Sequence, residues 1–199
     1  SNVNDMFGMF YRASAFNQYI GNWNVNNVTD MSSMFYRTDA FNQDIGNWNV
    51  SNVTKMKNMF YEARAFNQDL STWNVSNVTT MSAMFALAIS FNQDIGDWNV
   101  SKVTNMSDMF WMAISFNQDL SNWNVSNVTD MSDMFAGVTL STTNYDALLN
   151  GWAQLDLKSN VQFHGGSSTY SCASQAARTL LINKSWRITD GGLEADTIN

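Results

Sequence analysis

Apolar residues recur along the chain with a period of 25 residues. The period is marked by a Met-Phe pair at 9–10, 34–35, 59–60, 84–85, 109–110 and 134–135, and by a tryptophan column that consists of Trp23, Trp48, Trp73, Trp98 and Trp123. No insertion or deletion interrupts the spacing. A fixed period of this size indicates units that stack directly on their neighbours, because an array of separate beads tolerates variable linkers.

Each unit contains two hydrophobic patterns. In "NWNVS" (47–51) apolar and polar residues alternate around Trp48 and Val50, which predicts a short strand. In "NVTDMSSMFYR" (27–37) the apolar residues have the i, i+3, i+4 spacing of one helical face, which predicts a helix of about two turns. Thr29 is expected to cap it. A strand, a helix and a return loop in every unit predict a right-handed β/α solenoid with a parallel β-sheet.

Two resemblances agree with this prediction. The spacing Ile45-x-x-Trp48-x-Val50-x-x-Val53 is similar to the L-x-x-L-x-L-x-x-N of a leucine-rich repeat, and the longer motif "FNQDI…WNVSNVTDMS.MF" resembles the BspA-like repeats of bacterial surface proteins and lipoproteins over roughly 3–192. The resemblance implies a leucine-rich-repeat-like solenoid. Because Val53 stands where the repeat usually has asparagine, another column must supply the asparagine ladder, and the candidates are Asn42, Asn67, Asn92 and Asn117.

The last sixty residues lose the period. We expect 1–139 to be a solenoid of about five repeats and 140–199 to be atypical β/α units that cap the same solenoid, since the end of a stack exposes an apolar face. A helix is predicted near 145–154 after Thr143 or Asn144, with strands at 161–165 and 186–189. A second helix is predicted from an apolar stripe at Ala173, Ala176, Ala177, Leu180 and Leu181.

Composition narrows the possible partners. The net charge is −7 with ten basic residues that form no run, so we expect no nucleic-acid partner. No apolar stretch is long enough for membrane insertion within this segment. Charged residues make up only 14%, which is typical of a surface that forms hydrogen bonds rather than one that steers ions. The chain begins inside a repeat, and we therefore expect it to be part of a longer protein.

The candidate ligand face comprises the polar positions that alternate with the apolar ones. They are Asn22, Asn47, Thr72, Asp97 and Asn122; Asn24, Asn49, Asn74, Asn99 and Asn124; and Asn26 with Ser51, Ser76, Ser101 and Ser126. The invariant middle column fits either a ligand-binding face or an asparagine ladder along the stack. The tryptophan and Met-Phe columns are in phase with the core, and we favour core over an aromatic ligand track. Variable positions on the predicted helix, Arg37, Glu62, Leu87 and Met112, are a second possible ligand surface.

Other columns suggest weaker hypotheses. An aspartate column could bind Ca²⁺, although solvated or backbone-bonded side chains are the simpler interpretation; it consists of Asp44, Asp69, Asp94 and Asp119. A threonine column could order water as in ice-binding proteins, although helix capping is simpler; it consists of Thr29, Thr54, Thr79, Thr104 and Thr129. We predict no enzyme, cofactor or metal site, because His164 and Cys172 belong to no catalytic motif and Cys172 is expected to be a buried thiol.

The sequence therefore predicts a non-enzymatic adhesion module, extracellular on a bacterial cell surface, that presents a repetitive polar face to a host or bacterial surface protein or to a glycan. A structural spacer without a ligand is the main alternative. The sequence leaves the oligomeric state open.

Overall fold

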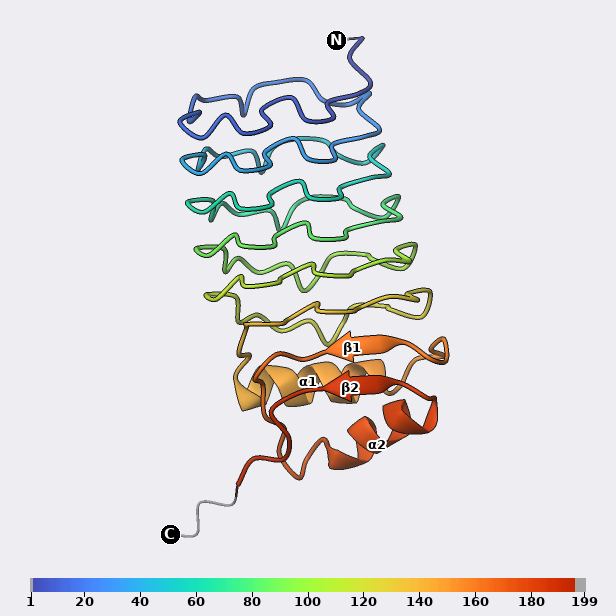
Figure 1. Ribbon diagram of the computed structural model, residues 1–199. Helices are drawn as coiled ribbons and strands as arrows, with labels where there is room; N and C mark the ends of the chain where they lie inside the picture. The colour runs from blue at the N-terminus through green and yellow to red at the C-terminus, as the bar shows by residue number, and fades with distance from the viewer. Residues whose placement is uncertain (1, 196–199) are drawn as a thin grey trace.

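The computed structural model describes residues 2–195 and has the form of an elongated stack of flat coils (Figure 1). Two helices, α1 (Thr142–Trp152) and α2 (Gln175–Asn183), and two short strands, β1 (Gln162–His164) and β2 (Arg187–Thr189), lie at the C-terminal end. The 25-residue units are built from turns. Within the described residues, their only β-structure is a series of isolated bridges, one per unit, such as that between Asp30 and Lys55.

The predicted β/α solenoid with a continuous parallel sheet is therefore wrong. The sheet has two strands, β1 and β2, which pair in parallel with Gln162 opposite Arg187. None of the repeats contains the predicted helix or the predicted strand. The physical reason differs for the two sides of each coil, which we call the ribbon wall (29–38 and its equivalents) and the motif wall (41–53 and its equivalents).

The ribbon wall consists of consecutive tight turns. Within a coil, the N–H of Met34 donates to the carbonyl of Met31, and the N–H of Tyr36 donates to the carbonyl of Ser33. The alternate N–H groups point to the next coil, as in the bond from the Ser33 N–H to the Lys57 carbonyl at 2.8 Å. Positive φ angles of 56° at Ser33 and 54° at Arg37 reverse the chain and prevent a helix. The predicted helical side is thus the side on which backbone hydrogen bonds join the coils.

The motif wall is joined mainly through side chains. The indole N–H of Trp48 donates to the Ile20 carbonyl at 3.1 Å, and the amide of Asn52 donates to the Asn26 carbonyl at 2.7 Å. Turns close within each coil, where the N–H of Val53 donates to the carbonyl of Val50 at 2.9 Å. The alternation around Trp48 therefore reports which side chains point inward, without an extended strand.

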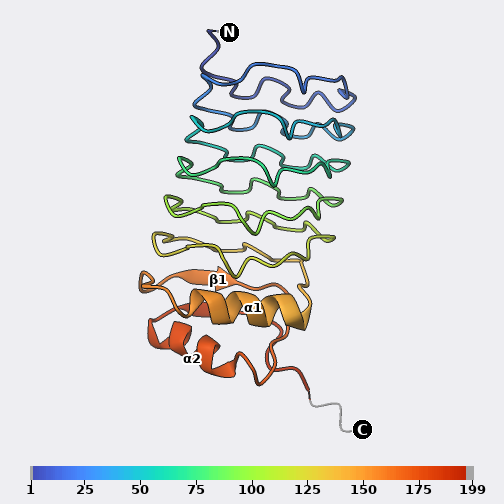
Figure 2. The same ribbon diagram turned by 180° about the vertical axis from the view of Figure 1, so that it is seen from behind.

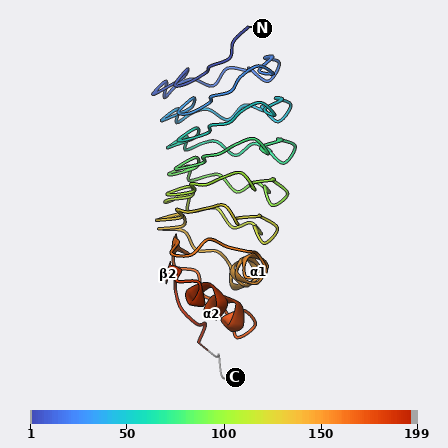
Figure 3. The ribbon, with the colours of Figure 1, turned by 90° about the vertical axis from the view of Figure 1, so that its right-hand side faces the viewer.

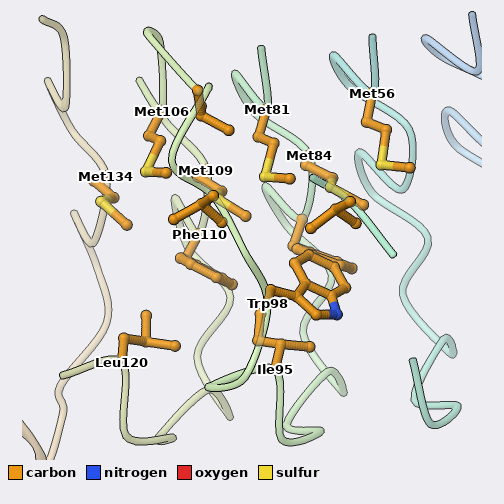
Figure 4. Packing of buried hydrophobic residues seen from close by; sticks show 14 of the residues in the cluster. Met56, Met81, Met84, Ile95, Trp98, Met106, Met109, Phe110, Leu120 and Met134 are labelled. Carbon is orange, nitrogen blue, oxygen red and sulfur yellow. The ribbon is translucent and has the colours of Figure 1, made fainter. Parts of the chain in front are cut away.

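Between the two walls lies a core of stacked columns (Figure 4). Trp48, Trp73, Trp98 and Trp123 are buried, which confirms the predicted core role of the tryptophan column, whereas Trp23 is half-buried. The Met-Phe pairs are also buried from Met34 onward, but Met9 in the first unit is exposed. Phenylalanine rings of successive coils lie nearly parallel, with Phe60 and Phe85 centroids 5.5 Å apart.

The C-terminal region continues the stack with regular elements (Figures 2 and 3). Ser141 caps α1, so the two predicted caps, Thr143 and Asn144, are wrong and lie inside the helix. Trp152 of α1 donates its indole N–H to the Leu120 carbonyl in place of a motif-wall tryptophan. β1 extends the ribbon wall through a bridge between Met131 and Phe163. The two predicted helices and two predicted strands of this region are thus confirmed.

The apolar stripe predicted for the second helix is only partly buried. Ala177 and Leu181 of α2 lie in the core, whereas Ala173 and Ala176 are exposed and Leu180 is 52% exposed. One face of α2 covers the end of the stack, and the opposite face carries apolar side chains into solvent.

Candidate functional site

The candidate ligand columns lie on the motif wall, on turns rather than on a sheet. Each asparagine of the invariant middle column accepts a hydrogen bond from the backbone N–H two residues later, as in the 3.1 Å bond from Ser51 to Asn49 Oδ1. The same bond recurs at Asn24, Asn74, Asn99 and Asn124. An asparagine side chain that bonds two residues ahead stabilises a turn. Turn formation therefore accounts for the invariant column, and the ladder along the stack that we considered for it is not formed.

The aspartate column makes turns in the same way. Asp44 accepts from the Gly46 N–H at 2.9 Å and Asp69 from the Ser71 N–H at 2.8 Å, and Asp94 and Asp119 do likewise. These bonds hold the pKa of Asp69 below its usual range. Among residues 2–195 no group of three acidic, histidine or cysteine side chains is arranged to hold a metal ion. The backbone-bonded interpretation of this column is confirmed.

The asparagine ladder lies in the other predicted column. The N–H of Asn67 donates to Asn42 Oδ1 at 3.0 Å, and Asn92 and Asn117 repeat the bond one coil further on. The threonine column also joins coils, because both the N–H and the hydroxyl of Thr54 donate to the Thr29 carbonyl. Threonine therefore does not cap a helix, and the polar residues common to all units are largely occupied in stacking.

One exposed column of the motif wall varies from unit to unit and consists of Asn22, Asn47, Thr72, Asp97 and Asn122. A second exposed position has Lys102 where the neighbouring coils have asparagine. Asn47 and Thr72 lie beside a shallow hollow of about 230 Å³ that also borders Asp44 and Asp69. Ser51, Ser76, Ser101 and Ser126 are half-buried, whereas Asn26 is exposed. The side chains of this column are exposed, but the Thr72 hydroxyl donates to the Gly46 carbonyl at 2.9 Å, so Asn47 and Asp97 are the better placed to face a ligand.

The ribbon wall carries an aromatic column that the sequence analysis did not single out. Tyr11, Tyr36 and Tyr61 stack, with centroids 4.7 and 4.6 Å apart. The next unit has Ala86 at this position, and the one after has Trp111. Ala86 therefore interrupts the aromatic column, and this break could have been found from an alignment of the repeats alone.

A groove of about 580 Å³ lies on the ribbon wall beside this interruption. Tyr61 and Trp111 line it from coils on either side of Ala86, and Ser82 and Ala83 line it from the coil between them. The other lining residues are Lys57, Asn58, Asp108 and Asp133. Positive φ angles at Asn58, Ala83, Asp108 and Asp133 direct this stretch of backbone into the turns that shape the groove.

Charge is unevenly distributed in the groove. Burial raises the pKa of Asp108 above its usual range, and the negative charges of Asp133 and Asp130 raise it further. Among the described residues, the ion pairs do not include Asp108, Asp133 or Lys57. The groove therefore offers carboxylate acceptors and an ammonium donor that no neighbouring charge occupies.

The second surface predicted from variable positions is not helical. Arg37 and Glu62 form an ion pair at 2.8 Å, Leu87 is half-buried, and Met112 is exposed. All four residues have positive φ and lie at the edge of the ribbon wall, next to the aromatic column.

The residues weighed for catalysis lie apart from the groove. His164 is in β1, and its Nδ1 accepts a hydrogen bond from the Gly166 N–H at 3.0 Å. Cys172 is exposed, so the expectation of a buried thiol is wrong. Cys172 comes before α2, on a segment of the cap that faces solvent.

Comparison with known proteins gives one match. A family model described as "Mycoplasma protein of unknown function, DUF285" matches residues 1–79 and residues 44–152. No curated protein and no solved structure matches the chain. Among residues 2–195, no helix has the length and apolar character needed to cross a bilayer.

Proposed function

Since the chain belongs to the Mycoplasma protein family of unknown function DUF285, we propose a function from its surface, namely a non-enzymatic binding module on the outside of a bacterial cell. Its ligand is a host or bacterial surface protein or a glycan. The resemblance of the repeats to BspA-like surface proteins supports the extracellular location.

One observation carries the proposal. The polar residues that repeat in every unit hold the coils together, whereas an exposed column on the motif wall and a partly buried aromatic column on the ribbon wall change from unit to unit. On the motif wall the change runs through Asn47, Thr72 and Asp97, and on the ribbon wall it runs from Tyr61 through Ala86 to Trp111. A spacer needs only the repeated residues. Exposed side chains that vary on a rigid scaffold are typical of binding surfaces.

The test compares two surface variants with the wild-type chain. One variant replaces Asn47, Thr72 and Asp97 by alanine, and the other replaces Tyr61 and Trp111 by alanine. Each protein is applied to arrays of glycans and of purified surface proteins, after thermal unfolding has shown that all three chains fold. We expect saturable binding that one of the two variants abolishes.

A spacer gives a different result. If the wild-type chain binds no component of either array, or if both variants bind as the wild type does, the module has no ligand on these surfaces and the proposal fails. Thermal hysteresis of the wild-type solution tests the ice-binding alternative in the same preparation.

A further inference from the structure

We propose that the groove between Tyr61 and Trp111 is a binding site for a neutral oligosaccharide. The inference rests on the proposed binding function and assigns a ligand class to one of its two surfaces.

The aromatic side chains determine the shape of the site. Tyr36 and Tyr61 stack directly because they stand on adjacent coils. Tyr61 and Trp111 stand two coils apart, which separates their backbones by about 9–10 Å. Ala86 on the coil between them supplies no ring and is itself fully buried. Tyr61 and Trp111 therefore line the groove from the two outer coils, with Ser82 and Ala83 on the coil between them. Half-buried aromatic rings offer apolar faces on which the C–H groups of a pyranose can pack.

The polar side chains determine the charge of the ligand. Lys57 and Asn58 offer hydrogen-bond donors, while Asp108, Asp133 and the Asn58 carbonyl oxygen offer acceptors. The two carboxylates outnumber the single ammonium of Lys57, so an anionic ligand would be repelled. Sugar hydroxyls both donate and accept, so an uncharged polyol can bond to the ammonium and to the carboxylates. The polar groups therefore favour a ligand that is rich in hydroxyls and carries no negative charge.

The state of Asp108 agrees with this ligand. The carboxylate is partly removed from water and faces the negative charges of Asp133 and Asp130, which raises its pKa. Hydroxyl groups that donate to Asp108 would replace the lost hydration and stabilise its charged form. A ligand that brought a further carboxylate would add to the repulsion.

A ring added on the coil between Tyr61 and Trp111 provides the sharpest test. Ala86 is fully buried, so the added ring of Ala86→Tyr must displace the two neighbouring rings that line the groove or project between them. Trp111→Ala instead removes one of the two aromatic rings that line the groove. Tyr11→Ala is the matched control, because Tyr11 ends the same column in the first unit, far from the groove. The probes are lactose, maltotriose and the trimer of N-acetylglucosamine, with an acidic heparin-derived tetrasaccharide and a lysine-rich peptide for comparison, all measured by titration calorimetry on the full chain.

We expect at least one neutral oligosaccharide to bind the wild-type chain. Its affinity falls by about tenfold or more in both Ala86→Tyr and Trp111→Ala, the range seen when a central aromatic contact is removed, and stays unchanged in Tyr11→Ala. If Ala86→Tyr unfolds at or above the wild-type temperature, its loss of affinity comes from the changed groove and not from a loss of folding. Should Ala86→Tyr not fold, Trp111→Ala decides the matter alone.

Three results overturn the inference. They are the absence of binding by every neutral probe, preferential binding of the acidic tetrasaccharide or the basic peptide, and unchanged affinity in the groove variants. If a ligand is instead lost only when Asn47, Thr72 and Asp97 are replaced, the groove inference fails while the binding function stands. If no ligand binds either wall, both fail.

Discussion

Replacing Trp98 by phenylalanine tests whether the side-chain bonds of the motif wall hold the stack together. Trp98 is 3% exposed, and its indole N–H donates to the Leu70 carbonyl at 3.0 Å. Its ring lies 6.5 Å from that of Trp73 with an interplanar angle of 4° (Figure 4 shows Trp98 between neighbouring coils). Phenylalanine keeps the aromatic contact but removes the donor, so that the buried carbonyl loses its partner.

The expected cost has two parts. A buried acceptor left without a donor costs about 1–3 kcal/mol. The smaller ring leaves unfilled space that adds on the order of 1 kcal/mol. Trp98→Phe should therefore lower the free energy of unfolding by about 2–4 kcal/mol, and substitution by benzothienylalanine, which keeps the shape and lacks the N–H, by about 1–3 kcal/mol.

Urea unfolding measures this cost. Hydrogen exchange shows where in the stack the cost falls, because stacked repeats can open locally instead of unfolding in one step. Trp23→Phe is the control, since Trp23 is half-buried in the first unit and should change stability by about 0.5 kcal/mol or less. We expect amide protection to fall most in residues 66–100. Equal urea midpoints for Trp98→Phe and Trp23→Phe would refute the argument that indole-to-carbonyl bonds stabilise the stack.

Three further predictions concern the C-terminal cap. Ser185 is exposed just after α2 with φ 64°, so Ser185→Gly should raise the free energy of unfolding in urea by about 0.5–1 kcal/mol, whereas Ser159→Gly, at an exposed site without positive φ, should not raise it; a gain in both would show that the backbone angle is not the cause. Arg178 pairs with Asp190, whose side chain is 2% exposed, so Arg178→Met should cost about 3–5 kcal/mol in urea unfolding. The double variant Arg178→Met with Asp190→Asn removes the charge but keeps an acceptor for the Tyr145 hydroxyl, so it should recover part of this cost; no recovery would contradict a penalty from an unpaired buried charge. Burial tends to raise the pKa of Asp146, but hydrogen bonds from two serines outweigh it and hold that pKa below its usual range. The stabilising effect of Asp146 is therefore present above the unfolded pKa near 3.9 and is lost as pH falls through the lower folded value. Asp146→Asn should lower the urea midpoint at neutral pH and make the midpoint decline less steeply between about pH 5 and 2. An equally steep decline in the variant would count against this role of Asp146.

Residue spacing predicted the stacking contacts more successfully than the backbone conformation. The period of 25 residues identified the buried tryptophan and Met-Phe columns and the ladder at Asn42, because those contacts depend only on which residues lie opposite each other in successive coils. The i, i+3, i+4 spacing of Met31, Met34 and Phe35 did not distinguish a helix from consecutive turns. Both place such residues on one side, and in a stack the turns also direct alternate N–H groups to the next coil.

A signal for the turns was present in the repeat alignment. Gly8 occupies the position of Ser33 in the first unit, and Gly137 occupies the position of Met112 in the last. All four residues have positive φ. Glycine at such positions indicates a left-handed backbone that a helix does not contain. The sequence analysis did not identify the groove, because its lining residues come from four coils. The break in the aromatic column at Ala86 becomes visible only when the coils are aligned with one another.

The way in which the coils are joined determines which polar residues serve stacking and which remain free to bind a ligand. A continuous sheet would satisfy the backbone by itself and leave alternate side chains free for a ligand. On the motif wall the backbone turns back on itself within each coil, so that side chains such as Asn52 and Trp48 must connect one coil to the next. Stacking then constrains most of these residues, although Lys102 replaces asparagine in one coil and donates to Asn77 Oδ1 instead. Repetition on this wall is therefore evidence of structure rather than of binding. On the ribbon wall, backbone hydrogen bonds already join the coils, so the side chains are free to differ from unit to unit. The break in the aromatic column between Tyr61 and Trp111 lies on this wall.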